Sequence, residues 1–178
     1  MKRTNFRRRS QNITDYKRRL ALLKSGEIRL VVRRTSRNII AQLVDYEPEG
    51  DKVLTTVDMK FLNGVGWLGG ANTPAAYLIG LEVAKRAKNL KVKKAILDAG
   101  RTHSSSKVFA LVKGATERGL VIPCSKEVFP SMERCNGKQL DEYANKAKSP
   151  HFSKIKEKKV SFQENFEKVL NKIKGDKK

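Results

Sequence analysis

Apolar runs separated by polar turns predict three successive β-strands in the first third of the chain. The segments 29–33 and 39–46 are rich in β-branched residues and are separated by a polar turn at 35–38. An acidic turn at 47–51 then leads into a third such segment at 52–57. Because short turns join the three strands, we expect them to pair antiparallel.

Helical periodicity begins at Thr73, whose side-chain oxygen is expected to act as the N-cap, with Pro74 at the first helical position. We expect this helix to continue to about Asn89 and to pack on the sheet. The apolar face that would make this contact comprises Tyr77, Leu78, Leu81 and Ala84.

Residues 93–98 lead into an apolar segment that ends at Gly100, and this segment predicts a fourth strand. The helix at 73–89 connects it to the third strand. A second helix is expected from about Ser106, with Gly119 placed to end it. Residues 120–123 are compatible with one further short strand. Helical crossovers on a mixed sheet are typical of the α/β class.

The last part of the chain has a polar, helical pattern. One helix is predicted over 137–148 and another over 161–173, where Ser161 and Glu164 have the spacing of a capping box. The second helix has an apolar face formed by Phe162, Phe166, Val169, Leu170 and Ile173. That face requires a cover, which is either the core of the same chain or a partner protein or RNA.

The predicted fold is therefore α/β, with a mixed sheet of three antiparallel strands plus a crossover strand, and with packed helices. We expect a basic arm at residues 1–24, the α/β core at 25–125 and a basic helical extension at 126–178. A chain of 178 residues has the length of about one domain.

The charge of the chain is concentrated at its two ends. Thirty-nine Lys and Arg against eighteen Asp and Glu leave a formal net charge of +21, of which residues 1–37 carry +11 and residues 146–178 carry +7. Such terminal concentrations indicate arms that follow the phosphates of a polyanion. Because so much charge opposes a packed core, we expect both arms to be disordered when alone.

The first arm is richer in arginine than in lysine, and the second contains lysine alone. A guanidinium binds phosphate through two donors and stacks on bases, so we assign the closer contacts to the first arm. The candidate nucleic-acid-binding cations of this end and of the adjoining hairpin tip are Arg3, Arg7, Arg8, Arg9, Lys17, Arg18, Arg19, Arg33, Arg34 and Arg37. The candidates for base stacking are Phe6, Tyr16 and Trp67, and for Trp67 the alternative is packing on the core of the chain.

The loop after the fourth strand is a second candidate for phosphate binding, because it combines hydroxyl groups and cations at the start of a helix. Its candidate residues are Arg101, Thr102, His103, Ser104, Ser105, Ser106 and Lys107. A plain serine-capped loop is the alternative interpretation.

No arrangement of residues supports catalysis. The segment 64–69 matches the dinucleotide fingerprint GxGxxG, but it does not join a strand to a helix, and no acid ends a following strand. Asp98, His103 and the serines at 104–106 have the residue types of a nucleophilic triad, but their spacing shows no base oriented toward a hydroxyl. We therefore expect no enzyme, no cofactor and no small-molecule substrate.

Metal and membrane functions also lack support. Cys124 and Cys135, with His103 and His151, match no zinc pattern and are too few for a disulfide framework. The chain has no uncharged apolar run of about 18 residues, and no apolar stretch follows its basic start. We expect a cytosolic protein with two reduced thiols and no membrane partner.

Three segments carry a resemblance to a known family: Asn72–Leu81 (NTPAAYLIGL), Asp98–Thr102 (DAGRT) and Val108–Ala115 (VFALVKGA). The chain resembles ribosomal large-subunit protein eighteen over about residues 1–125. Its basic helical extension resembles the archaeal and eukaryotic branch, and its length suits the archaeal form.

The resemblance implies a non-catalytic protein that binds 5S ribosomal RNA and anchors it in the central protuberance of the large subunit. The implied partners are 5S ribosomal RNA, large-subunit ribosomal RNA and a neighbouring 5S-binding ribosomal protein, within the cytoplasmic ribosome. The resemblance assigns RNA contacts to the arginine-rich arm and to the loop Arg101–Lys107. In this loop the chain has serines where the bacterial form has a glycine.

Two other hypotheses stay open. A general DNA or chromatin protein would also be strongly cationic but would not depend on the fold of an RNA. A nucleotide-dependent enzyme using the glycine-rich segment is a less favoured alternative.

Overall fold

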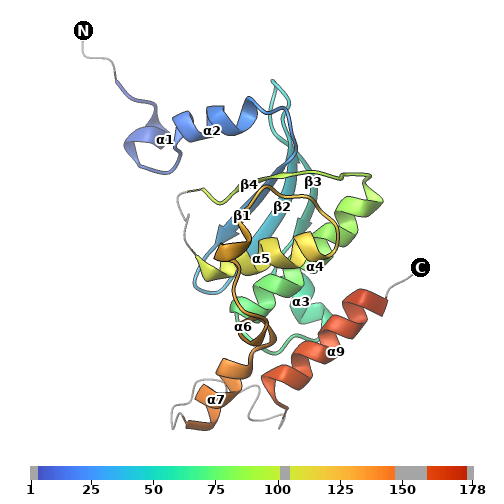
Figure 1. The fold of residues 1–178 in the computed structure, drawn as a ribbon. Helices are drawn as coiled ribbons and strands as arrows, with labels where there is room; N and C mark the ends of the chain where they lie inside the picture. Colours follow the sequence, from blue (N-terminus) through green and yellow to red (C-terminus); the bar gives the residue numbers. More distant parts are fainter. Residues whose placement is uncertain (1–3, 101–104, 147–159, 176–178) are drawn as a thin grey trace.

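A four-stranded mixed sheet forms the centre of the computed structural model, which describes residues 4–100, 105–146 and 160–175 (Figure 1). The strand order is β3-β2-β1-β4, with the first three strands antiparallel and β4 parallel to β1. The strands are β1 (Arg29–Arg34), β2 (Ile39–Asp45), β3 (Lys52–Val57) and β4 (Ile96–Asp98). The predicted α/β class and mixed sheet are thereby confirmed.

The fourth strand is shorter than predicted. It covers three residues rather than 93–98, and the segment 120–123 contributes only an isolated parallel bridge between Lys94 and Val121. Few residues thus join β4 to the sheet, and its end at Asp98 lies directly before the candidate phosphate loop.

Helix α4 (Thr73–Asn89) has the predicted length but a different N-cap. Asn72 is extended, and its side-chain oxygen accepts a hydrogen bond from the backbone N–H of Ala75 at 3.1 Å. Thr73 is already helical, so the prediction that it caps the helix is wrong and Pro74 lies one position further in.

Helix α4 lies between the sheet and helix α5 (Ser106–Glu117), which explains why it is buried on most sides (Figure 1). The two helices meet at glycines. A Cβ atom on Gly80 would lie 2.0 Å from the carbonyl oxygen of Leu111, and one on Gly114 would lie 2.4 Å from that of Tyr77. The close packing of this pair therefore requires glycine at both positions.

A short helix, α3 (Met59–Val65), includes the first two residues of the glycine-rich segment 64–69 and was not predicted. Asp58 caps it by accepting from the N–H of Phe61, and Gly66 ends it with a positive φ of 107°. Trp67 follows in the core, where it is 3% exposed and its Nε1–H donates to the carbonyl oxygen of Gly70. The prediction that Trp67 stacks on bases is therefore wrong.

Three short helical segments follow the core: η1 (Lys126–Val128), α6 (Met132–Asn136) and α7 (Lys138–Lys146). Helix α7 corresponds to the helix predicted over 137–148 and begins one residue later than predicted. Gly137, with a φ of +88°, separates α6 from α7. Two helices arise because this left-handed residue ends the first of them.

Helix α9 (Phe162–Gly175) packs on the core. Four residues of its apolar face are buried, namely Phe162, Phe166, Val169 and Ile173. The ring of Phe166 lies 5.9 Å from that of Tyr77 in α4. The cover for this face is therefore the core of the same chain, which is the first of the two alternatives that the sequence left open.

Polar contacts hold the start of α9. The Oγ of Ser161 accepts from the N–H of Glu164, as the capping-box spacing predicts. The carboxylate of Asp141 in α7 accepts from the N–H groups of Phe162 at 2.7 Å and Gln163 at 3.1 Å. These bonds connect α7 to α9.

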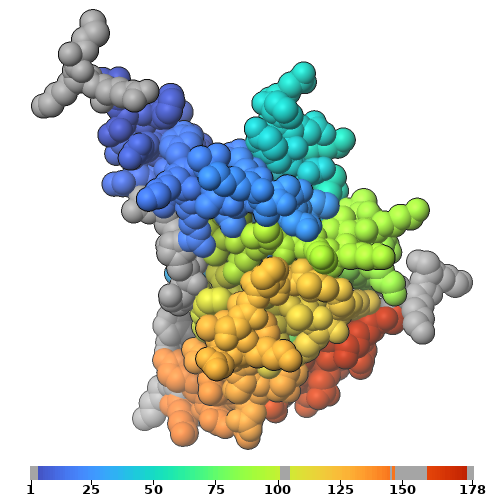
Figure 2. All heavy atoms as spheres, turned by 45° about the horizontal axis from the view of Figure 1, so that its top comes forward, coloured from blue at the N-terminus to red at the C-terminus, as the bar shows by residue number. Residues whose placement is uncertain are grey.

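The basic arm forms two helices, α1 (Arg7–Ser10) and α2 (Tyr16–Leu23), with no buried residue in either. Asp15 caps α2 by accepting from the N–H of Arg18. The expectation of an arm without structure is thus wrong for residues 4–24. Figure 2 shows the arm (blue) and the β2–β3 turn (cyan) at one end of the molecule, and the C-terminal extension (orange and red) at the other.

Candidate nucleic-acid interface

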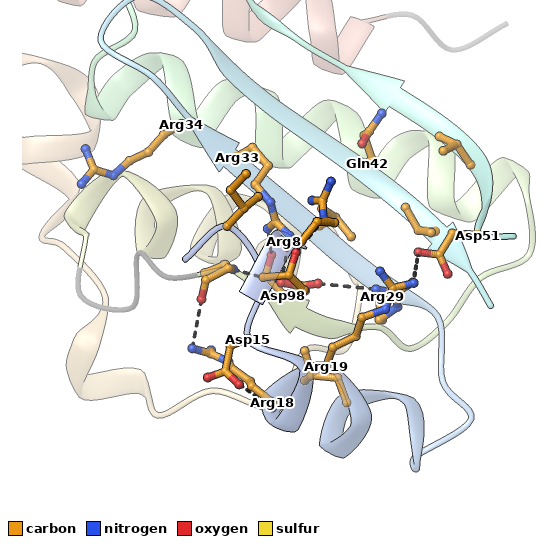
Figure 3. A pocket seen from close by; sticks show the side chains of 18 residues that line it. Arg8, Asp15, Arg18, Arg19, Arg29, Arg33, Arg34, Gln42, Asp51 and Asp98 are labelled. Carbon is orange, nitrogen blue, oxygen red and sulfur yellow. Dashed lines mark hydrogen bonds and ion pairs between the residues drawn. The ribbon is translucent and has the colours of Figure 1, made fainter. Parts of the chain in front are cut away.

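A cleft of about 460 Å³ lies between the arm and the face of the sheet that α4 leaves open (Figure 3). Strand alternation creates this face, because Leu30 and Val32 are buried in the core while Val31 and Arg33 point to the other side. Six arginines line the cleft, namely Arg8, Arg18, Arg19, Arg29, Arg33 and Arg34. Its acidic residues are Asp15, Asp51 and Asp98.

The cleft brings together cations that were predicted from separate segments. Arg8, Arg18 and Arg19 come from the arm, whereas Arg33 and Arg34 come from the end of β1. Because six guanidinium groups face three carboxylates, the cleft keeps an excess of positive charge that attracts an anion.

Two aspartates tie the arm to the sheet through a chain of ion pairs. Asp51 lies 2.7 Å from the guanidinium of Arg19 and 2.9 Å from that of Arg29. Asp98 lies 3.5 Å from Arg29 and 3.2 Å from Arg33. The chain runs from α2 across β1 to the end of β4, so it positions the arm over the sheet.

Arg29 is a component of the site that the sequence analysis missed. It is 3% exposed, and its ion-pair partners lie 22 and 69 positions further along the chain. The available signal was strand alternation, which places Arg29 on the same face as Arg33.

Gly100 links the arm to the end of β4. Its φ is +60°, its N–H donates to the Asp98 carboxylate at 2.9 Å, and its carbonyl oxygen accepts from Arg18 at 3.1 Å. A Cβ atom here would lie 3.2 Å from the Arg33 guanidinium carbon. Glycine thus satisfies both the backbone conformation and the close approach of Arg33.

The candidate phosphate loop is described only at its end. Arg101, Thr102, His103 and Ser104 lie outside the described residues, as does Arg3 of the arm. Ser105 is the N-cap of α5, but its side chain makes no capping hydrogen bond, and Ser106 begins the helix.

Lys107 has a contact that competes with phosphate. Its Nζ donates to the carbonyl oxygen of Ala71. Burial, followed by the nearby charge of Arg34, lowers the pKa of its ammonium group. Lys107 is therefore less suited to phosphate contact than the exposed cations of the arm.

The remaining candidate RNA-binding cations lie on the outer surface of the arm and at the hairpin tip. Arg7, Arg9 and Lys17 are exposed, as is Arg37 at the hairpin tip. Arg9 and Lys17 also line a second cleft, of about 490 Å³, that adjoins Gly100.

Two aromatic rings lie beside these cations. Phe6 is 74% exposed and Tyr16 is 36% exposed, and their ring centroids are 5.6 Å apart. Both rings offer accessible faces for base stacking, in contrast to Trp67.

The chemistry of the described residues at this site is that of charge binding. Asp98 is occupied by two arginines and the N–H of Gly100, so it orients no catalytic base. Across residues 4–100, 105–146 and 160–175, no three His, Cys, Asp or Glu side chains are grouped to hold a metal ion. No helix within these ranges is long and apolar enough to cross a bilayer.

The two cysteines lie away from the cleft. Burial raises the pKa of the thiols of Cys124 and Cys135, and no disulfide joins them. Both groups therefore stay protonated near neutral pH, which suits a structural role.

Comparison with known proteins decides the family. A family model described as "Ribosomal large subunit proteins 60S L5, and 50S L18" matches residues 2–95. The chain is also 45% identical over 147 residues to "Large ribosomal subunit protein uL18" of Korarchaeum cryptofilum (strain OPF8), a match that covers 81% of this chain and 75% of that protein. The chain belongs to this ribosomal family.

The L5/L18 family is structural and non-enzymatic, which confirms the prediction that the chain is not an enzyme. The chain is thus a protein of the large ribosomal subunit, and its place is in the cytoplasmic ribosome. The matched residues 2–95 include the arm and strands β1, β2 and β3, which form most of the arginine-lined cleft.

Proposed function

We propose that the chain binds 5S ribosomal RNA through its N-terminal arm and the arginine-lined cleft. In this proposal it anchors that RNA in the central protuberance of the large subunit, beside a second 5S-binding ribosomal protein and in contact with large-subunit ribosomal RNA. The observation that carries the proposal is the convergence of guanidinium groups from the arm, from Arg29 and from the hairpin on one cleft.

Phosphate neutralisation is expected to supply most of the affinity. Arginines bind phosphate oxygens through paired donors, and each phosphate that is engaged releases counterions from the RNA. Exposed cations such as Arg7 and Arg9, which form no ion pair with an acid of the described residues, are suited to this role. Arg19 and Arg33 already pair with Asp51 and Asp98, so their main contribution is to position the arm.

Specificity is expected to come from the shape of the folded RNA. The deep groove of an A-form helix hides its base edges, so proteins contact 2′-hydroxyls, phosphates and unpaired bases instead. The exposed pair Phe6 and Tyr16 adds two rings on which unpaired bases can stack.

The proposal assigns a separate role to each part of the chain. Residues 1–24 form the arm that contacts RNA, residues 25–125 form the scaffold that aims the arm and completes the cleft, and residues 126–178 extend that scaffold. The loop Arg101–Lys107 is retained as a second RNA contact.

The test is a binding experiment with the full chain and the 5S ribosomal RNA of the same organism. We expect saturable binding that weakens steeply as salt is added. Competitors at equal nucleotide concentration separate the alternatives: unlabelled 5S RNA should displace the complex, while duplex DNA and transfer RNA should not. If duplex DNA displaces the 5S RNA equally well, the chain is a general nucleic-acid binder and the proposal fails.

A further inference from the structure

Helix α2 extends over the sheet without packing against it. None of its residues is buried, and its contacts with the body include the bonds of Arg18 to Gly100 and of Arg19 to Asp51. The space beneath it, about 460 Å³, is within the range of cavities that hold a small ligand, about 300–1,000 Å³.

Much of the floor of this cleft is apolar, although Gln42 of β2 also lines it. Val31, Val44 and Val53 of the open sheet face line it, and Leu22 lines it from the side of α2. Val53 is 49% exposed, so an apolar surface is left accessible between the guanidinium groups. An apolar floor surrounded by cations matches a ligand with one flat, weakly polar part and one anionic part.

A buried donor in the cleft lacks a partner. The side chain of Arg29 is 3% exposed, and its Nε–H has no hydrogen-bond partner among the described residues. An unpaired buried donor is costly, and an acceptor atom on a ligand in the cleft would remove that cost.

We infer that the cleft accepts one unpaired nucleotide of the bound RNA. Its base lies on the valine floor, and its flanking phosphates lie at the guanidinium groups of Arg8, Arg18 and Arg34. A base inside a double helix cannot reach the floor, because its faces are stacked and its edges lie in the grooves. This inference rests on the proposed RNA binding and adds to it the form of RNA that enters the cleft.

The test changes the floor without changing the charge. Val53→Gln places a larger, polar and neutral side chain in the cleft, and Val121→Gln makes the same change at a valine that is 55% exposed outside the cleft. We expect the 5S RNA affinity of V53Q to fall about tenfold with an unchanged salt dependence, and that of V121Q to equal the wild type. Equal affinities of V53Q and the wild type would overturn the inference.

A second variant guards against misfolding. If V53Q melts earlier than the wild type, Val53→Thr keeps a β-branched side chain of similar size, and the same weakening is expected on a smaller scale. Wild-type affinity of a folded V53T would then overturn the inference. If the wild type itself fails to bind 5S RNA, the proposed function is what fails.

Chemical modification of the RNA bases gives an independent readout. At saturating protein, the wild type should protect one or a few unpaired bases that regain reactivity in the V53Q complex, while protection elsewhere is the same in both. Identical protection patterns for the wild type and V53Q would contradict an occupied cleft.

Discussion

The two basic ends of the chain differ in how they are held. The arm at residues 4–24 has no buried residue in either helix and is tied to the body through polar contacts such as those of Arg18 and Arg19. Helix α9, in the other basic end, buries two phenylalanines against the core. Both ends carry a net positive charge, but the first presents its cations on the surface, whereas the second completes the fold.

The difference follows from the spacing of apolar residues. Phe162, Phe166, Val169 and Ile173 recur at helical intervals and form a continuous stripe. In α2, Leu20 is 58% exposed and no such stripe is buried. Charge thus predicts what an end can attract, whereas apolar periodicity predicts whether it packs.

The largest effect on stability is expected from Phe166→Ala. The ring is 3% exposed and contacts Tyr77, so its removal leaves a cavity between α9 and α4. The free energy of unfolding should fall by about 3–5 kcal/mol, measured by chemical denaturation. A loss below about 1 kcal/mol would mean that α9 is not part of the folded body.

Asp98→Asn should have the next largest effect. It removes one of the two carboxylates that pair with buried Arg29, the other being Asp51, and the carboxylate that pairs with Arg33. Because Arg29 keeps its ion pair with Asp51, we expect a loss of about 1–3 kcal/mol in the free energy of unfolding, as for hydrogen bonds to charged groups. The exposed acid Glu49 provides the control, since Glu49→Gln should leave stability unchanged.

Asp141→Ala tests the cap of α9. Its carboxylate accepts from the N–H groups of Phe162 and Gln163, so its removal should cost about 1 kcal/mol in denaturant unfolding. The neighbouring Glu142→Ala, at an exposed position, should cost much less. Equal losses for the two variants would show that Asp141 is not a cap in solution.

Phe6→Ala should have the smallest effect on stability and a clear effect on RNA. The ring is 74% exposed, so the free energy of unfolding should change by less than about 0.5 kcal/mol. Loss of a stacking ring should weaken 5S RNA binding by about 1–2 kcal/mol in a titration. An unchanged affinity would remove Phe6 from the interface.

The regular elements of the core were largely predictable because their signals are local. The runs of β-branched residues located β1, β2 and β3 within a residue or two, and helical periodicity located α4 and α5. Helix α3 was missed because its last residues include Gly64, a poor helix former, although Asp58 carried a capping signal.

The candidate site was only partly predictable because its geometry depends on distant pairs. The arm and hairpin arginines were identified from charge, but their meeting at one cleft depends on pairs such as Arg29 with Asp98, 69 positions apart. Trp67 was misassigned for the same reason, since its burial depends on elements brought together by the fold. Sequence patterns within a short segment do not indicate contacts between residues that are far apart in the chain.

The central claim is that the N-terminal arm, and not the C-terminal end, which is also basic, supplies the main phosphate contacts with the RNA. Two matched triple variants of the full chain test it: Arg7, Arg8 and Arg9 changed to Gln, and the exposed Lys146, Lys168 and Lys174 changed to Gln. The measurement is the salt dependence of 5S RNA affinity. We predict that the arginine variant binds at least tenfold more weakly with a slope of log K against log salt reduced by about 2, while the lysine variant keeps the wild-type slope. Equal flattening of the slope by both variants would contradict the account.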